Sequence, residues 1–414
     1  MNTPPAGSPD TGKAHPGRFN RWIGWLGPGF ITAALVLGPG SITISSSLGA
    51  SFGYSLLWVI LIATFFMITF VGMSIRISLA TDCSLLTTIR NKWGNPVAVI
   101  IGIGIFLVTA SFQAGNAVGA GLAFSELSGT HITPWIITFT LVSILLLYFK
   151  QFYKILEKLM LVLVAVMLLS FLGTLIIVKP SLSGIAGGLV PGIPSGSLML
   201  AVALVASSFS MAGAFYQSYL VKEKKWKSEE LKKAKLEGFT GIAVLGLISA
   251  IILICAAAVL QPLEITITSA ADMGLAIEPL FGGLATNLFM MGLFGASFSS
   301  LLGNATVGGT LLSDALGFGN RLSDRNTRLF IMVVMITGAT VAVWFGGIPI
   351  DLIIFAQGVT IFVVPFVGII LYMTANSKDI VHDFHNGTWS NIFGFMGLLF
   401  LIVLGFMNAR ALFF

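Results

Sequence analysis

Eleven long apolar segments, separated by short polar stretches, dominate the pattern of this sequence. Most of them approach or exceed the roughly 20 residues that a helix needs to cross a lipid bilayer. The segments cover residues 22–48, 54–80, 96–127, 134–149, 153–178, 197–221, 236–260, 277–312, 327–345, 350–374 and 390–409. The pattern therefore predicts an all-α, polytopic membrane protein with eleven transmembrane helices.

The first apolar segment is interrupted in its middle by Gly38-Pro39-Gly40-Ser41. Proline removes a backbone donor and glycine widens the accessible φ and ψ, so the helix is expected to unwind there. Non-helical backbone at membrane depth is tolerated only where it is buried in protein or lines a wet cavity. The break at Gly38, Pro39, Gly40 and Ser41 is therefore a candidate substrate-binding site.

The sixth segment carries a candidate for a second break. Five spans precede it, so spans one to five and six to ten enter the membrane from opposite sides, which is typical of an inverted repeat. Its middle holds Ser210, Met211, Ala212 and Gly213, without a proline. Small residues alone often mark close helix packing, but the repeat-related position favours a site formed by two broken helices.

Composition and charge support a membrane protein. Of 414 residues, 56% are hydrophobic and 9% charged, whereas soluble domains carry about 25% charged residues. Residues 1–17 are polar and lack the apolar region of a signal peptide, which predicts a disordered cytoplasmic tail. Residues 18–414 are expected to form one transporter domain, with repeats at about 18–180 and 195–376 and an extra helix at about 390–409.

The distribution of positive charge predicts the orientation. Twenty of the 22 lysines and arginines lie in alternate loops, and only Lys179 and Arg410 lie on the opposite side. This bias places the N-terminus in the cytoplasm and the C-terminus outside, in the cell (inner) membrane. The lysine run at 222–235 then belongs to a solvated loop, so no nucleic-acid partner is predicted despite the net charge of +6.

Several motifs resemble the Nramp divalent-metal transporter family across nearly the whole chain. They are Gly27-Pro28-Gly29-Phe30, Gly38-Pro39-Gly40-Ser41, residues 52–61, Ala80-Thr81, residues 120–124, the Met211 region, residues 294–310 and Ala356-Gln357-Gly358. The resemblance implies a LeuT-like fold with a 5+5 inverted repeat and broken helices one and six. It also implies proton-driven uptake of divalent metal ions.

The two breaks depart from the pattern of the family they resemble. Gly38-Pro39-Gly40-Ser41 stands where the family has Asp-Pro-Gly-Asn, and Met211-Ala212-Gly213 stands where it has Met-Pro-His. A further family histidine corresponds to Ser218, which the resemblance makes a candidate for the transport path. By this resemblance the thioether is retained while the aspartate, asparagine and histidine are lost.

Three amides complete the candidate site and transport path. Gln113 and Asn116 align with an acidic pair that the family uses for proton passage, and Gln357 matches a family glutamine that can join the metal shell. Interhelical hydrogen bonding is an equally good interpretation of Gln113 and Asn116. For Met211 the alternative is ordinary helix packing.

The acidic residues and histidines all lie in loops or near span ends, so no carboxylate or imidazole is expected at the bilayer centre. A divalent cation that sheds its water needs anionic or strong dipolar ligands, and proton coupling usually needs an intramembrane acid or histidine. Helix N-termini after Gly40 and Gly213 instead suit an anion or a carboxylate. Seven nearby hydroxyls, on Ser41, Thr43, Ser45, Ser46, Ser207, Ser208 and Ser210, add polar contacts.

These features predict an alternating-access transporter for a small neutral or anionic solute, or for a cation that stays hydrated. The expected partners are this small ion or polar solute and the lipid bilayer, with no cofactor. Ordinary transport of a divalent metal through non-standard ligands and a non-transporting membrane sensor remain alternatives. An enzyme is not favoured, because no nucleophile–base pair occurs within the predicted spans.

Overall fold

The computed structural model describes residues 37–268, 270–344, 354, 358 and 360–413, and helices are the only regular elements in them. Seven of the described helices or helix runs are long and apolar enough to cross a membrane, and a bent pair at Thr360–Asn376 and Lys378–Phe384 raises this to eight. Shorter apolar helices account for other predicted spans. The all-α, polytopic architecture is therefore confirmed.

The described α-helices follow one another with short connections. They are α2 (Pro39–Phe52), α3 (Leu57–Ala80), α4 (Leu85–Trp93), α5 (Asn95–Ser128), α6 (Ile132–Leu146), α7 (Lys150–Val178), α8 (Leu182–Gly188), α9 (Leu198–Ser208), α10 (Met211–Glu223), α11 (Leu231–Val259), α12 (Ala270–Gly274), α13 (Glu278–Phe281), α14 (Ala285–Ala315), α15 (Arg325–Trp344), α17 (Val364–Asn376), α18 (Lys378–Val381) and α19 (Thr388–Phe413). Short 3₁₀ turns cover Ser228–Glu230, Gln261–Leu263, Leu275–Ile277, Gly282–Leu284, Thr360–Phe362 and His382–Phe384.

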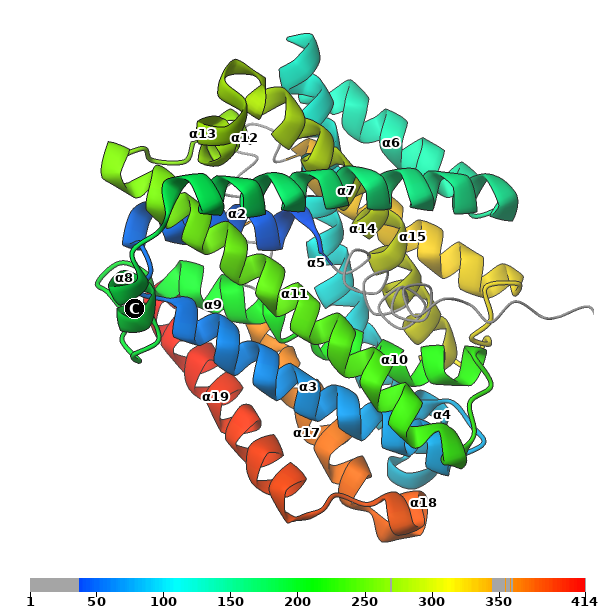
Figure 1. Ribbon diagram of the computed structural model, residues 1–414. Helices are drawn as coiled ribbons and strands as arrows, with labels where there is room; N and C mark the ends of the chain where they lie inside the picture. Colours follow the sequence, from blue (N-terminus) through cyan, green and yellow to red (C-terminus); the bar gives the residue numbers. More distant parts are fainter. Residues whose placement is uncertain (1–36, 269, 345–353, 355–357, 359, 414) are drawn as a thin grey trace, which may run out of the picture.

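Helix α2 lies at the centre of the packing. It contacts α11, α9, α5 and α14, and its residues from Pro39 to Ala50 are all buried. Ile44 belongs to the apolar cluster built around α3, α9, α10 and α17, whereas Ile42 belongs to the cluster around α5, α7, α11 and α14. Figure 1 shows α2 among these helices, with α3 and α19 on one flank. A short helix that began at the predicted break is thus enclosed on all sides.

The boundaries differ from the sequence expectation most clearly in the eighth span. A continuous helix was predicted from residue 277, but α14 begins at Ala285, after a series of one-turn helices. Gly282 has φ of +53°, a left-handed conformation that favours glycine, and Pro279 occupies the first turn of α13. Pro279 therefore lies where a new helix can start, and Gly282 ends that helix after one turn.

Glycine allows the closest approach of α2 to α11. A Cβ atom at Gly49 would lie 2.3 Å from the backbone oxygen of Leu253 and 2.8 Å from Cβ of Ala256. Helices in membranes associate through such small residues, because lipid supplies little hydrophobic driving force between them. Gly49 therefore sets the spacing between the broken first helix and α11.

We expect Gly49→Val to destabilise the protein by about 1–3 kcal/mol, because the added side chain would overlap backbone atoms of α11. The measurement is the thermal unfolding midpoint in detergent. The matched control is Gly187→Val in α8, where a Cβ meets no atom within 4 Å. Equal midpoints for both variants would contradict the tight α2–α11 contact.

Candidate functional site

The first predicted break is a helix N-terminus in the interior of the protein. Gly38 is extended (φ −96°, ψ 170°), and α2 begins at Pro39. The first N–H groups of a helix lie outside its hydrogen-bond ladder, and here they belong to Gly40 and Ser41 because Pro39 has none. Aligned peptide dipoles also give this end a positive partial charge. The start of α2 therefore presents buried donors.

Helices α5 and α14 bring amide and hydroxyl groups to Gly38. A Cβ atom there would lie 3.1 Å from Oδ1 of Asn116 and 3.5 Å from Oγ of Ser300. The Ser300 hydroxyl also donates to the backbone oxygen of Leu37 at 3.1 Å. Position 38, where the family resemblance implies an aspartate, is thus surrounded by neutral polar groups.

A hydrogen-bonded amide network joins α5 to α14 behind this break. Gln113 donates through Nε2 to the oxygen of Leu301 at 2.7 Å, and its Oε1 accepts from Asn304 at 3.1 Å and from Asn116 at 3.4 Å. Asn116 also donates to the oxygen of Ser300 at 3.2 Å. Gln113 and Asn116, two of the predicted path residues, therefore make interhelical hydrogen bonds, and Asn116 in addition contacts the first break.

The sixth span is broken as predicted. Helix α9 ends at Ser208, α10 begins at Met211, and Phe209 and Ser210 lie between them. No proline is needed, because Ser210 caps the new helix: its Oγ accepts from the N–H of Gly213 at 3.2 Å. The N–H groups of Met211 and Ala212 remain outside the helical ladder.

The side chains near this second break are mostly engaged in packing. Met211 is 1% exposed, and its Sδ would lie 3.5 Å from a Cβ atom at Gly368 of α17. A Cβ atom at Gly213 would lie 3.5 Å from Cε of Met67. These contacts match ordinary helix packing for Met211, the alternative that the sequence left open.

The remaining predicted residues are Ser218, a candidate for the transport path, and Gln357. Ser218 lies two turns along α10, where its hydroxyl donates to the oxygen of Phe215 at 2.7 Å and its own oxygen accepts from Ser78. Gln357 lies outside the described residues. The amide of Asn304 and the hydroxyl of Ser300, both on α14, were not singled out from the sequence. Their only signal was the serine- and glycine-rich character of that span.

Buried hydroxyls without partners gather on α2 and beside the breaks. They belong to Thr43, Ser45, Ser46 and Ser47 on α2, to Ser208 at the end of α9, and to Ser297 on α14. Ser297 and Pro39 both face Gly119 of α5, where a Cβ would lie 2.4 Å and 2.6 Å from their atoms. A buried hydroxyl without a hydrogen bond is costly, so this region is suited to water or a polar solute.

The carboxylate of Asp314, which is only 4% exposed, lies away from both breaks at the end of α14. It accepts hydrogen bonds from Tyr219 and from Thr87, so it joins α10 and α4 to α14. The sequence analysis predicted only that this acid lies near the end of a span. No group of three His, Cys, Asp or Glu side chains with metal-binding spacing occurs in the described part of the chain.

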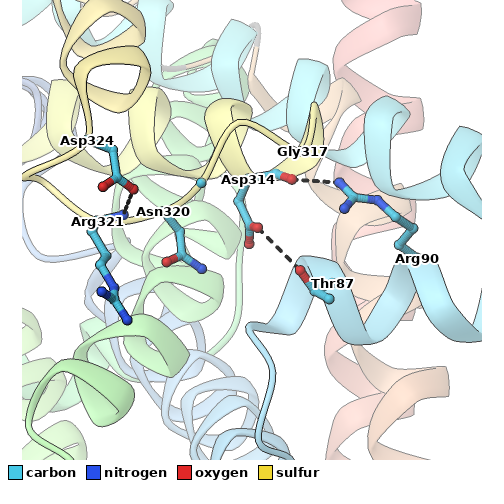
Figure 2. A pocket seen from close by; sticks show the side chains of 8 residues that line it. Thr87, Arg90, Asp314, Gly317, Asn320, Arg321 and Asp324 are labelled. Atoms are coloured by element: carbon cyan, nitrogen blue, oxygen red, sulfur yellow. Dashed lines mark hydrogen bonds between the residues drawn. The ribbon is translucent and has the colours of Figure 1, made fainter.

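Beside Asp314 lies a polar pocket of about 390 Å³. Figure 2 shows Asp314 directed toward Thr87, with Arg90 on one side and Arg321 on the other. Arg90 donates to the backbone oxygens of Asp314 and Ala315 at 2.6 and 2.7 Å, and Asp324 accepts from the N–H of Arg321 at 3.2 Å. The pocket is lined by α4, by the end of α14 and by the loop that leads from α14 to α15 and carries Arg321.

The family model described as natural resistance-associated macrophage protein-like (Nramp) matches residues 29–409. The chain belongs to the Nramp family. The divalent metal cation transporter MntH of Staphylococcus aureus (strain bovine RF122 / ET3-1) is 24% identical over 411 residues, covering 93% of this chain and 90% of MntH.

Solved structures show the same fold. A manganese transporter of Eremococcus coleocola, crystallised with an aromatic bis-isothiourea compound, matches with a TM-score of 0.76 and 19% identity over 97% of this chain and 89% of that one. Mhp1, a nucleobase-cation-symport-1 family transporter, matches with a TM-score of 0.59 and 14% identity over 94% and 93%. The predicted LeuT-like fold and the transporter class, as opposed to an enzyme, are confirmed.

We expect Tyr219→Phe to destabilise this Nramp protein by about 1–3 kcal/mol, because the buried Asp314 carboxylate would lose a hydroxyl donor. The thermal unfolding midpoint in detergent measures the effect. Tyr148→Phe is the control, since the exposed Tyr148 hydroxyl makes one hydrogen bond to the described residues, a weak one to the sulfur of Met332 at 3.8 Å. A drop of the same size for both variants would count against the helix-joining role of Tyr219.

Proposed function

We propose that this protein is a secondary transporter that moves a small neutral or anionic solute, or a cation that keeps its water shell, by alternating access. One observation carries the proposal. Two helix N-termini, at Gly38–Ser41 and Ser210–Gly213, are buried beside unpaired hydroxyls, while the groups within contact distance of Gly38 are the amide of Asn116 and the hydroxyl of Ser300.

Electrostatics argues against a bare divalent ion at these breaks. Dehydrating a cation costs many kcal/mol, and the compensation comes from anionic or strongly dipolar ligands. The positive ends of α2 and α10 oppose a cation, and Met211 packs against α17. An anion, a carboxylate or a neutral hydroxylated solute would instead accept hydrogen bonds from the free N–H groups.

Family membership favours a second candidate, ordinary divalent metal transport. The relatives named above are a divalent metal cation transporter and a manganese transporter. In this chain such transport would use Met211, hydroxyls and backbone oxygens as ligands, with Gln357 as a further amide. A membrane sensor that kept the fold without transport is a third candidate.

We also propose that the N-terminus lies in the cytoplasm and that the protein resides in the cell (inner) membrane.

Flux in proteoliposomes tests the function directly. We expect accumulation of a small anionic or neutral polar solute, or of Mg²⁺ as a strongly hydrated ion, and no accumulation of Mn²⁺ at low micromolar concentration. An imposed proton gradient should change the initial rate by less than about twofold, because proton coupling usually needs an intramembrane acid or histidine. Protein-free liposomes are the control.

The flux experiment separates the three candidates. Saturable uptake of Mn²⁺ that responds to a proton gradient would establish metal transport and overturn the argument from the missing carboxylate. Failure to accumulate any solute, together with ligand-dependent thermal stabilisation, would identify a sensor.

Restoring charge at the breaks tests where the solute binds. We expect the double variant Gly38→Asp with Gly213→His to bind Mn²⁺ at least about tenfold more tightly than the parent and to lose the native transport activity, because a carboxylate and an imidazole are strong metal ligands. Isothermal titration with Mn²⁺ and the flux assay provide the measurements.

A substitution of the same charge far from the breaks controls for general electrostatics. Gly187→Asp places a carboxylate on an exposed position of α8 and should leave Mn²⁺ binding unchanged. If the double variant binds Mn²⁺ no better than this control, positions 38 and 213 do not belong to one site.

A further inference from the structure

Two positively charged side chains meet where α3 ends and α11 begins. Gly238 of α11 fits against α3, because a Cβ there would lie 3.0 Å from side-chain atoms of both Val71 and Ile75. Lys235, one turn earlier, therefore lies near Arg76, and the two charges repel each other. Both residues are on the side of the protein that carries the lysine- and arginine-rich loops.

The partners of Arg76 are all neutral. Its Nη2 donates to Oδ1 of Asn386 at 2.6 Å and to Oγ of Ser390 at 3.3 Å, and its Nε donates to the oxygen of Gly72 at 3.2 Å. None of the ion pairs found among the described residues includes Arg76 or Lys235. Two adjacent cations are thus left without a compensating carboxylate.

Asn386 adds an unused donor to the same place. It is only 3% exposed, and its Nδ2 has no hydrogen-bond partner although its Oδ1 accepts from Arg76. Because both atoms belong to one amide, the free N–H group lies beside the guanidinium. A buried donor without an acceptor is costly, so the cluster is polar and positively charged and lacks an acceptor.

The surroundings identify the source of this anion as lipid. The cluster lies where α3 contacts α11 and α19. In Figure 1 α3 runs between these two helices. Trp389 at the start of α19 is 70% exposed and stacks on Phe393, and Leu236 of α11 is exposed as well. Tryptophan is typical of the membrane interface, and basic pockets between helices bind anionic head groups.

We propose that Arg76 and Lys235, with Asn386 and Ser390 positioning the guanidinium, bind the phosphate of an anionic phospholipid. The phosphate oxygens accept hydrogen bonds from the Arg76 guanidinium, which Asn386 and Ser390 hold in place by accepting from Nη2. Lys235 supplies the second positive charge. The acyl chains lie along the apolar surface beside Trp389 and Leu236. The lipid thereby connects α19 to α3 and α11.

Titration of the purified protein in neutral detergent with phosphatidylglycerol, phosphatidylcholine or inorganic phosphate tests this site. We expect phosphatidylglycerol to raise the thermal unfolding midpoint and to remain bound in native mass spectra, while the other two have little effect. Lys235→Gln should weaken the apparent affinity for phosphatidylglycerol about fivefold, the contribution of one lysine near a membrane surface. Lys235→Arg should retain the affinity.

Lys232→Gln is the matched control, because Lys232 is exposed and lies one turn from Lys235. It should leave the affinity unchanged. Equal effects of phosphatidylglycerol and phosphatidylcholine would overturn the proposal, as would equal losses in the Lys232 and Lys235 variants. Stabilisation by inorganic phosphate alone would show that a free ion, and not a lipid, occupies the site.

Discussion

The need to satisfy backbone polar groups inside a bilayer governs this structure. A helix meets that need along its length but not at its ends, and this chain places the starts of α2 and α10 in the protein interior. At the second break Ser210 caps α10 with its own hydroxyl, whereas at the first Ser300 donates to Leu37, the residue before the extended Gly38. The protein interior therefore does locally what water does for a soluble helix.

Close packing allows protein groups to take the place of water at these helix ends. Glycines at positions 49 and 119 let α2 approach α11 and α5 to distances that a Cβ atom would prevent. With α2 held in this way, the amides of α5 and the serines of α14 reach Gly38. The same packing leaves a row of α2 hydroxyls buried without partners. Tight backbone contact on some faces and unpaired polarity on others are what a binding site between helices requires.

The side chains that contact Gly38 and extend behind it are neutral. Gln113, Asn116 and Asn304 form a network in which amides bond to one another and to backbone oxygens. Such a network can join two helices, but it cannot bind or release protons as carboxylates do. The carboxylate of Asp314, by contrast, lies at a helix end and joins α4, α10 and α14.

The sequence by itself determined the architecture, because runs of apolar residues with a glycine–proline interruption leave few structures possible in a bilayer. It located the start of α2 and the break between α9 and α10 to within a few residues, and it predicted that acids and histidines avoid the span centres. Only the tertiary structure decided what faces each break: Asn116 and Ser300 at Gly38, α17 at Met211, and neither break at Ser218. The late start of α14 and the burial of Asp314 could not be predicted from the sequence either. Hydropathy reports how deeply a residue lies in the membrane, whereas contacts depend on helix rotation and on side chains distant in sequence.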